Sequence, residues 1–139
     1  MQMAPYITFN GNCEAAFAFY QQHLGGVPGG IFRYEGTPIE HQVPVAWGNK
    51  IMHASMTVGG QLLMAADAAP GLYEEPKGFS LSLQVSDVAD AERIFAALAT
   101  GGRVLMPLEK TFWAARFGMI VDQFGIQWMI NCEGANDSK

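Results

Sequence analysis

The stretch FSLSLQVSDVADAERIFAALATGGRVLM, residues 79–106, contains the pattern that decides the fold. Apolar and polar residues alternate over Phe79–Val85, which is typical of a strand with one buried face. Asp87 follows as a candidate helix N-cap. The apolar positions behind it share one helical face: Val88, Ala91, Phe95 and Leu98. Gly101-Gly102 ends the helix, because glycine adopts the left-handed conformation at little cost, and Arg103–Met106 is again strand-like. The stretch predicts strand, helix and strand in that order.

The same order occurs in the first half of the chain. Pro5–Phe9 predicts a strand, Asn12 a helix N-cap, and Gly25-Gly26 the end of that helix. The expected inner face of the helix consists of Cys13, Ala16, Phe17, Tyr20 and Leu24. The interval from cap to first terminal glycine is similar in the two halves, which indicates an internal repeat.

Three further strands follow in each half. In the first they are Ile31–Tyr34, Ile51–Val58 and Gln61–Ala66, the last two joined by Gly59-Gly60 as a hairpin. In the second they are Arg103–Met106, Phe117–Val121 and Ile126–Asn131, with Phe112–Arg116 in or beside a loop. The sequence therefore predicts an α+β fold of two βαβββ modules, about residues 4–66 and 79–131. We expect one domain over residues 1–132 and a polar C-terminal tail over 133–139.

Composition narrows the class of protein. The 139 residues are 50% hydrophobic and carry a formal net charge of −5, which argues against nonspecific nucleic-acid binding. Cys13 and Cys132 have no CxxC spacing and predict free thiols in a reducing compartment. The N-terminal residues lack a signal-peptide pattern, and no apolar run reaches the roughly 20 residues of a membrane span. We expect a cytoplasmic protein without membrane or nucleic-acid partners.

Alternation along the strands separates two faces. Over residues 52–58 the apolar set is Met52, Ala54, Met56 and Val58, and the alternate set is His53, Ser55 and Thr57. Over residues 79–86 the polar set is Ser80, Ser82, Gln84 and Ser86, and residues 126–131 alternate in the same way. The apolar sets should face the helices. The polar sets either face water, as is usual in an antiparallel sheet, or line a pocket.

Several segments together resemble a known family. They are PYITFNGNCEAA at 5–16, IMHA at 51–54, LMAAD at 63–67, VLMPL at 104–108, FW at 112–113 and DQFG at 122–125. In this order, from Pro5 to about Asn131, the chain resembles the PhnB-like family of the vicinal-oxygen-chelate superfamily (glyoxalase/bleomycin resistance protein/dioxygenase). The resemblance implies modules that form a curved mixed sheet around a concave pocket, with the helices on the convex side.

The resemblance also implies where a metal would bind. Metal-dependent members take His and Glu ligands from the first and last strands of each module, and the matching positions here are Tyr6, Met64, Ser80 and Met129. Divalent metals prefer imidazole, carboxylate or thiolate ligands, and the neighbouring residues are no better: Thr8, Leu63, Ser82 and Trp128. We therefore predict no metal and no other cofactor. Such proteins have been labelled methyltransferase-like. This sequence does not support that label, because it contains no glycine-rich strand-to-helix turn of the kind that binds a nucleotide cofactor.

The candidate site follows from the polar sets. His53 is the candidate acid–base residue, because free histidine titrates near neutral pH, and its alternative role is that of a hydrogen-bonded structural histidine. The candidate substrate-binding residues are Tyr6, Ser55, Ser80, Ser82, Gln84, Trp113, Arg116 and Gln127. If the modules curl as in the family, these residues converge in one cavity, with Trp113 and Arg116 at its border. A loop cluster of Glu40 and His41 with His53 is a weaker metal alternative.

Two functions remain open on these grounds. One is a glyoxalase-like protein that binds a small organic molecule as a metal-independent or degenerate enzyme. The other is a non-catalytic sequestering protein, as in bleomycin resistance. In both cases we expect a homodimer, since two-module members commonly pair and open sheets leave edges to cover.

Overall fold

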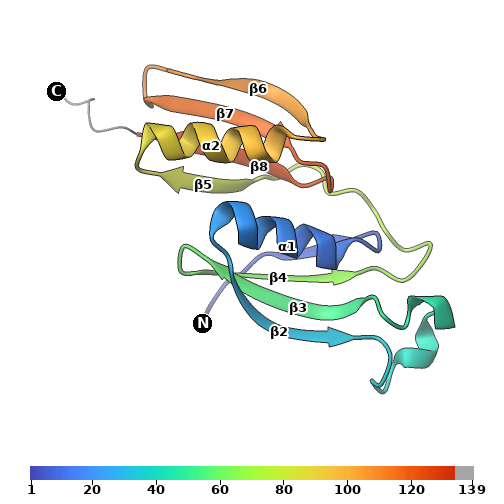
Figure 1. The fold of residues 1–139 in the computed structure, drawn as a ribbon. Coiled ribbons are helices and arrows are strands. Elements are labelled where there is room, and N and C mark those ends of the chain that lie inside the picture. The colour runs from blue at the N-terminus through green and yellow to red at the C-terminus, as the bar shows by residue number, and fades with distance from the viewer. Residues whose placement is uncertain (134–139) are drawn as a thin grey trace. The chain divides into compact units, whose positions relative to one another are not determined.

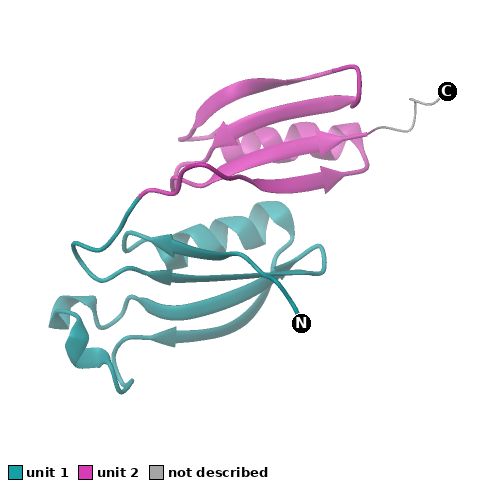
Figure 2. Cartoon of the chain, turned by 180° about the vertical axis from the view of Figure 1, so that it is seen from behind, with its two compact units in different colours: residues 1–74 teal, residues 75–139 magenta. Residues whose placement is uncertain are grey.

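The computed structural model describes residues 1–133. The chain divides into two compact units, and the boundary between them along the sequence falls after Glu74 (Figures 1 and 2). Each unit consists of one helix and one four-stranded mixed sheet. The predicted pair of βαβββ modules is confirmed. The predicted polar tail, apart from Glu133, lies outside the described residues.

The first unit begins with β1 (Tyr6–Phe9) and α1 (Cys13–Leu24). They are followed by β2 (Val27–Arg33), two 3₁₀ turns, η1 (Glu40–Gln42) and η2 (Val45–Trp47), and then β3 (Ile51–Val58) and β4 (Gln61–Asp67). The strand order is β1-β4-β3-β2, with β1 parallel to β4 and the other pairs antiparallel. The predicted hairpin turn is confirmed, because Gly59 and Gly60 both have positive φ, 57° and 83°.

The second unit repeats this topology. It consists of β5 (Leu81–Val85), α2 (Val88–Ala99), β6 (Arg103–Glu109), β7 (Arg116–Val121) and β8 (Gln127–Cys132). The strand order is β5-β8-β7-β6, with β5 parallel to β8. β6 is longer than the sequence predicted and contains Pro107, which an edge strand tolerates.

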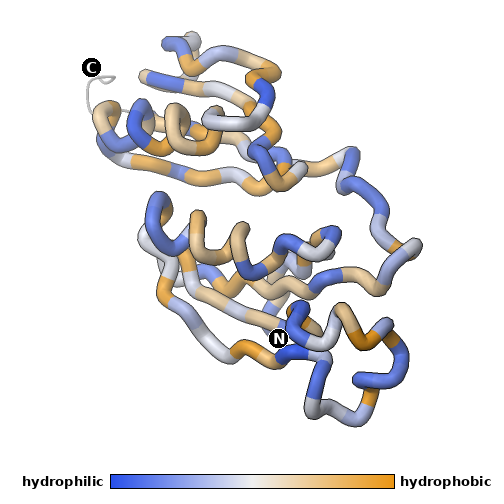
Figure 3. Tube along the Cα trace, turned by 45° about the vertical axis from the view of Figure 1, so that its right-hand side comes forward, coloured by the Kyte–Doolittle hydropathy of each residue, from blue (hydrophilic) through white to orange (hydrophobic). Residues whose placement is uncertain are grey.

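Each helix covers one face of its own sheet, so each sheet has a helix-covered face and a helix-free face (Figures 1 and 2). In the first unit Phe17 of α1 meets Phe9 edge to face, with ring centroids 6.5 Å apart. In the second unit Gly118 of β7 lies so close to Phe95 of α2 that an added Cβ would collide with its ring. Hydrophobic and hydrophilic residues are interleaved along both helices, as two-faced packing requires (Figure 3).

The helix faces differ slightly from the prediction. The buried residues of α1 are Cys13, Ala16, Phe17 and Tyr20, and those of α2 are Ala91, Ile94, Phe95 and Leu98. Leu24 and Val88, which were expected on these faces, are only half-buried. Both stand at helix ends, where the sheet beneath the helix provides less cover.

Irregular pairing changes the parity of β3. The register passes from Phe32↔His53 to Arg33↔Ile51, so β3 contains one extra residue at this point. Ile51 is therefore buried, at 1% exposure, and Met52, which was expected in the core, is half-buried. Beyond the bulge the alternation holds: Ala54 and Met56 are buried.

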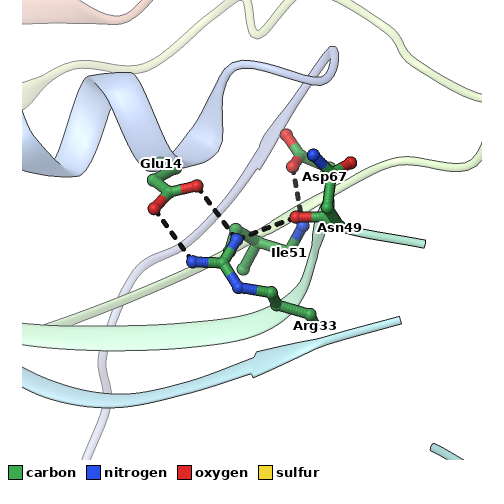
Figure 4. A network of polar contacts seen from close by, with 5 residues as sticks. All are labelled: Glu14, Arg33, Asn49, Ile51 and Asp67. Atoms are coloured by element: carbon green, nitrogen blue, oxygen red, sulfur yellow. Dashed lines mark hydrogen bonds and ion pairs between the residues drawn. The ribbon is translucent and has the colours of Figure 1, made fainter. Parts of the chain in front are cut away.

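The two helices begin differently. Asp87 caps α2 as predicted, because its carboxylate accepts a hydrogen bond from the Asp90 N–H. The prediction that Asn12 caps α1 is wrong, since its side chain makes no cap hydrogen bond. The buried carboxylate of Asp67 at the end of β4 takes this role: it accepts the N–H groups of Cys13 and Ile51, both at 2.9 Å. Figure 4 shows the bond to Ile51.

No helix within residues 1–133 is long and apolar enough to cross a membrane.

Candidate functional site

The helix-free face of the first sheet brings together two of the predicted residues, Tyr6 of β1 and His53 of β3. The Tyr6 hydroxyl lies 3.1 Å from His53 Nδ1, and the two ring centroids are 5.6 Å apart. Burial is the main cause that raises the pKa of Tyr6, with smaller contributions from Tyr34 and Cys13, so its phenol stays protonated at neutral pH. A phenol can donate or accept a hydrogen bond, and either ring nitrogen of histidine can hold the proton.

An aromatic residue that the sequence analysis missed completes this group. Phe32 of β2 pairs with His53 in register, their ring centroids are 6.5 Å apart, and Phe32 is 55% exposed. Phe32 lies within the predicted strand Ile31–Tyr34, but the bulges on either side of it leave no sequence signal, so its cross-strand partner could not be assigned. Tyr6, His53 and Phe32 form an aromatic group from three different strands.

Ser55 lies on the same face but is partly covered. A Cβ on Gly29 would collide with the Ser55 hydroxyl, so the backbone of β2 passes directly against this side chain. The close approach coincides with a bulge in β2, where the register shifts between Pro28 and Ile31. Ser55 therefore borders the aromatic group from beneath the bulge.

The helix-free face of the second sheet joins four predicted residues by hydrogen bonds. Gln127 Nε2 donates to Ser80 Oγ at 2.7 Å, and Gln84 Nε2 donates to Ser82 Oγ at 3.1 Å. Asn131, which was not among the predicted site residues, donates from Nδ2 to Gln84 Oε1 at 2.8 Å. The result is a strip of hydroxyl and amide groups along β5 and β8.

The two loop candidates lie on opposite sides of this sheet. Trp113 is half exposed and meets Phe117 of β7 at a centroid distance of 5.4 Å. Phe117 pairs with Asn131, so it belongs to the helix-free face. Arg116 instead bonds Glu92 of α2 at 3.4 Å and pairs with the buried Cys132. This is a different placement from the one predicted, because Arg116 begins β7 and its parity directs it toward the helix.

The positions that match the family's metal ligands do not fit a metal. Tyr6 pairs with Met64 as expected, but Met129 pairs with Ser82 and not with the predicted Ser80, which bonds Gln127. With either serine, two thioethers, a phenol and a hydroxyl stand where imidazoles and carboxylates are needed. Within residues 1–133 no group of three or more His, Cys, Asp or Glu side chains could hold a metal ion. The absence of a functional metal stays a prediction.

The weaker metal alternative loses its third member. Glu40 and His41 line a cavity of about 460 Å³ together with Glu35, in the segment that contains η1 and η2. His53 lies beside Tyr6 and Phe32 instead. The Glu40 carboxylate accepts the Gly36 N–H at 2.8 Å, which gives it a local structural role.

Comparison with known proteins decides the family. Residues 2–130 match the model of the Glyoxalase/Bleomycin resistance protein/Dioxygenase superfamily. The chain belongs to this superfamily. Protein YjdN of Escherichia coli is 35% identical over 94% of this chain and 95% of its own length.

Solved structures share the fold of this chain. Protein PA1353 from Pseudomonas aeruginosa is 51% identical, has a TM-score of 0.87, and is matched over 96% of this chain and 98% of its own. A PhnB protein from Bacillus cereus, at 23% identity, shares the fold with a TM-score of 0.82 over 95% of this chain and 99% of its own. The superfamily predicted from the sequence is thereby confirmed, and the solved proteins that share its fold include a PhnB protein. The convergence of the two polar sets in one cavity stays a prediction.

Proposed function

We propose that this superfamily member binds a small organic molecule on the helix-free faces of its sheets, without a divalent metal at the family's ligand positions. The observation that carries the proposal is the Tyr6–His53 pair beside the half-exposed Phe32. A few fixed polar groups beside aromatic surface are characteristic of small-molecule sites. The hydroxyl–amide strip of the second sheet has the same character.

The first candidate function is a metal-independent enzyme that uses His53 as its base. When the Tyr6 oxygen accepts the Nδ1 proton of His53, Nε2 keeps its lone pair and is able to take a proton from a bound molecule. Tyr6 then holds the ring orientation and stabilises the protonated imidazole. Loss of the hydroxyl alone should therefore lower the rate more than it weakens binding.

The second candidate function is binding without turnover. It is favoured by the helix-free face of the second sheet. There, one row of register partners crosses all four strands: Ser82, Met129, Met119 and Met106. Thioethers supply adaptable contact surface and do not transfer protons. A sequestering protein needs only such surface and matched polar groups.

The test is an unbiased metabolite screen by thermal shift, with and without added divalent metals. The panel of proteins is wild type, His53→Ala, Tyr6→Phe and the control His23→Ala, whose ring packs on Phe19 of α1. We expect hits that do not depend on added metal, that weaken in His53→Ala, and that persist in His23→Ala. Conversion of a hit by wild type but not by His53→Ala favours the enzyme, and binding without conversion favours sequestration.

Two results would count against the proposal. One is the absence of any hit in the metabolite library. The other is elemental analysis that finds about one zinc, nickel, iron or manganese per chain, released by substitution of Tyr6 or His53.

A further inference from the structure

The helix-free face of the second sheet is ordered along its strands. Three cross-strand rows follow one another at steps of two residues, which is about 7 Å per step. The first is Gln127, Val121 and Arg103, with Ser80 bonded to Gln127; the second is Ser82, Met129, Met119 and Met106; the third is Gln84, Asn131, Phe117 and Glu109. From Gln127 to Asn131 the face therefore extends about 13 Å.

The first row opens into a cavity with positive charge. The cavity has a volume of about 370 Å³, and Lys77, Arg103 and Gln127 line it together with Glu75. Two cations against one carboxylate leave one positive charge in excess. Within residues 1–133 neither Lys77 nor Arg103 forms an ion pair. An unpaired guanidinium beside a lysine, in a chain of net charge −5, is suited to a carboxylate.

The third row has the opposite character. Asn131 donates its Nδ2 proton to Gln84, and its Oδ1 is buried without a hydrogen-bond partner among the described residues. A buried acceptor of this kind is costly unless a donor reaches it, and a ligand on this face reaches it once the groups that cover the oxygen move aside. Phe117 pairs with Asn131, Trp113 packs against Phe117, and Glu109 adds a negative charge to the row. This end favours an aromatic group that carries a hydrogen-bond donor, and disfavours a carboxylate.

The methionine row between the two ends supplies apolar contact. Met119 and Met129 are half-buried and pair with each other across β7 and β8. Flexible thioethers adapt to an aromatic or unsaturated segment laid over them. The face thus matches an elongated molecule with an acid at one end and a donor at the other.

We infer that the helix-free face of the second sheet binds elongated aromatic organic acids, with the carboxylate at Lys77 and Arg103 and a ring hydroxyl or N–H donating to Asn131 Oδ1. This inference rests on the proposed function and names the ligand class of one of its faces.

The test uses three matched probes and calorimetric titration of the full chain. They are 4-hydroxycinnamate, cinnamate without the ring hydroxyl, and 4-hydroxycinnamyl alcohol without the carboxylate. We expect 4-hydroxycinnamate to bind about tenfold or more tightly than either analogue, because each lost charge-assisted or buried hydrogen bond corresponds to roughly one power of ten. Its affinity should fall as salt is raised.

Variants assign each preference to its end of the face. Arg103→Gln combined with Lys77→Gln should abolish the preference for the acid over the alcohol and remove most of the salt dependence. Asn131→Leu should abolish the preference for the hydroxyl and leave the preference for the acid. Trp113→Ala, in an exposed loop, should weaken all three probes. Arg93→Gln is the charge control, because Arg93 lies on α2 and approaches Asp90 at 3.7 Å.

The inference is overturned if none of the three probes binds at millimolar concentration, if the alcohol binds as tightly as the acid, or if Arg93→Gln changes binding as much as the Arg103 variant does. Asn131→Leu is expected to fold, since it removes an unpaired buried acceptor. If it does not fold, the Trp113→Ala and Arg103 results decide alone. Hits of other chemistry in the metabolite screen would leave the proposed function standing while this ligand class fails.

Discussion

Asp67→Asn tests the account of the first unit most sharply. The carboxylate is 1% exposed and accepts two backbone N–H groups, that of Cys13 at Oδ1 and that of Ile51 at Oδ2. It therefore joins the start of α1, the start of β3 and the end of β4, as Figure 4 shows in part. Its own carbonyl oxygen accepts the Tyr34 hydroxyl at 2.7 Å, and the substitution leaves that bond in place.

The magnitude follows from the change of one oxygen to NH₂. One charge-assisted hydrogen bond is lost, worth about 2 kcal/mol, and the N–H that now faces the amide donor is left unpaired at a cost of about 1 kcal/mol. We expect a fall of about 3 kcal/mol in the free energy of unfolding. For a chain of this size the fall corresponds to a decrease of roughly 10 °C in Tm.

Urea denaturation followed by far-ultraviolet circular dichroism measures the change. The matched control is Asp87→Asn, because Asp87 is an exposed N-cap and asparagine caps a helix about as well as aspartate. The control should lie within about 0.5 kcal/mol of wild type. If Asp67→Asn costs no more than Asp87→Asn, the network assigned to Asp67 does not hold the unit together.

Three further predictions concern thiols, pH and assembly. Cys13 and Cys132 are both 0% exposed, and burial, together with the charges of Asp67 and Glu14, raises the pKa of the Cys13 thiol to about 12. An aromatic disulfide reagent at pH 8 should therefore modify neither thiol in the native protein and both thiols in urea. Rapid reaction of Cys13 in the native protein would contradict its burial. The hydrogen bond from Arg33 lowers the pKa of Glu14, and the ionised carboxylate then contributes stability that is lost as pH falls through this lowered pKa. The difference in unfolding free energy between wild type and Glu14→Gln should therefore be present at pH 7, shrink as pH falls below the ordinary glutamate pKa and vanish below the lowered one; a difference independent of pH would refute the pairing. Light scattering at micromolar concentration should return twice the chain mass of 15.1 kDa, and a monomer would refute the expected homodimer.

The repeat of modules could be predicted because its signals are local. Glycine pairs, a capping aspartate at Asp87 and alternating strands each act within a few residues of the element they define. The cap of α1 could not be predicted in the same way. Asp67 is 54 residues from Cys13 in sequence, and only the parallel pairing of β1 with β4 brings them together.

The candidate site was predicted in part for a related reason. Alternation placed His53, Ser82, Gln84 and Gln127 on the helix-free faces, and the family resemblance added Tyr6. Bulges change parity without a sequence signal, so the partners of Phe32 could not be assigned.

Strand ends and register account for the remaining differences. Arg116 was placed in a loop, whereas β7 begins at this residue, and its parity directs the side chain to Glu92. The unpaired oxygen of Asn131 depends on which amide meets which neighbour across β5 and β8. These neighbours are fixed only by the register in which β5 and β8 pair.

We propose that the helix-free faces, and not the helix-covered faces, bind small molecules. Methionine methyl groups report on it directly, because Met64, Met119 and Met129 lie on helix-free faces and Met56 is buried on a helix-covered face at 1% exposure. Carbon-13 methyl-methionine spectra of the wild-type chain should be recorded during titration with 4-hydroxycinnamate and with the hits of the metabolite screen. We expect ligands to shift the signals of Met64, Met119 or Met129 and to leave that of Met56 unchanged. Shifts confined to Met56, or saturable binding that moves none of the three helix-free methionines, would contradict this proposal.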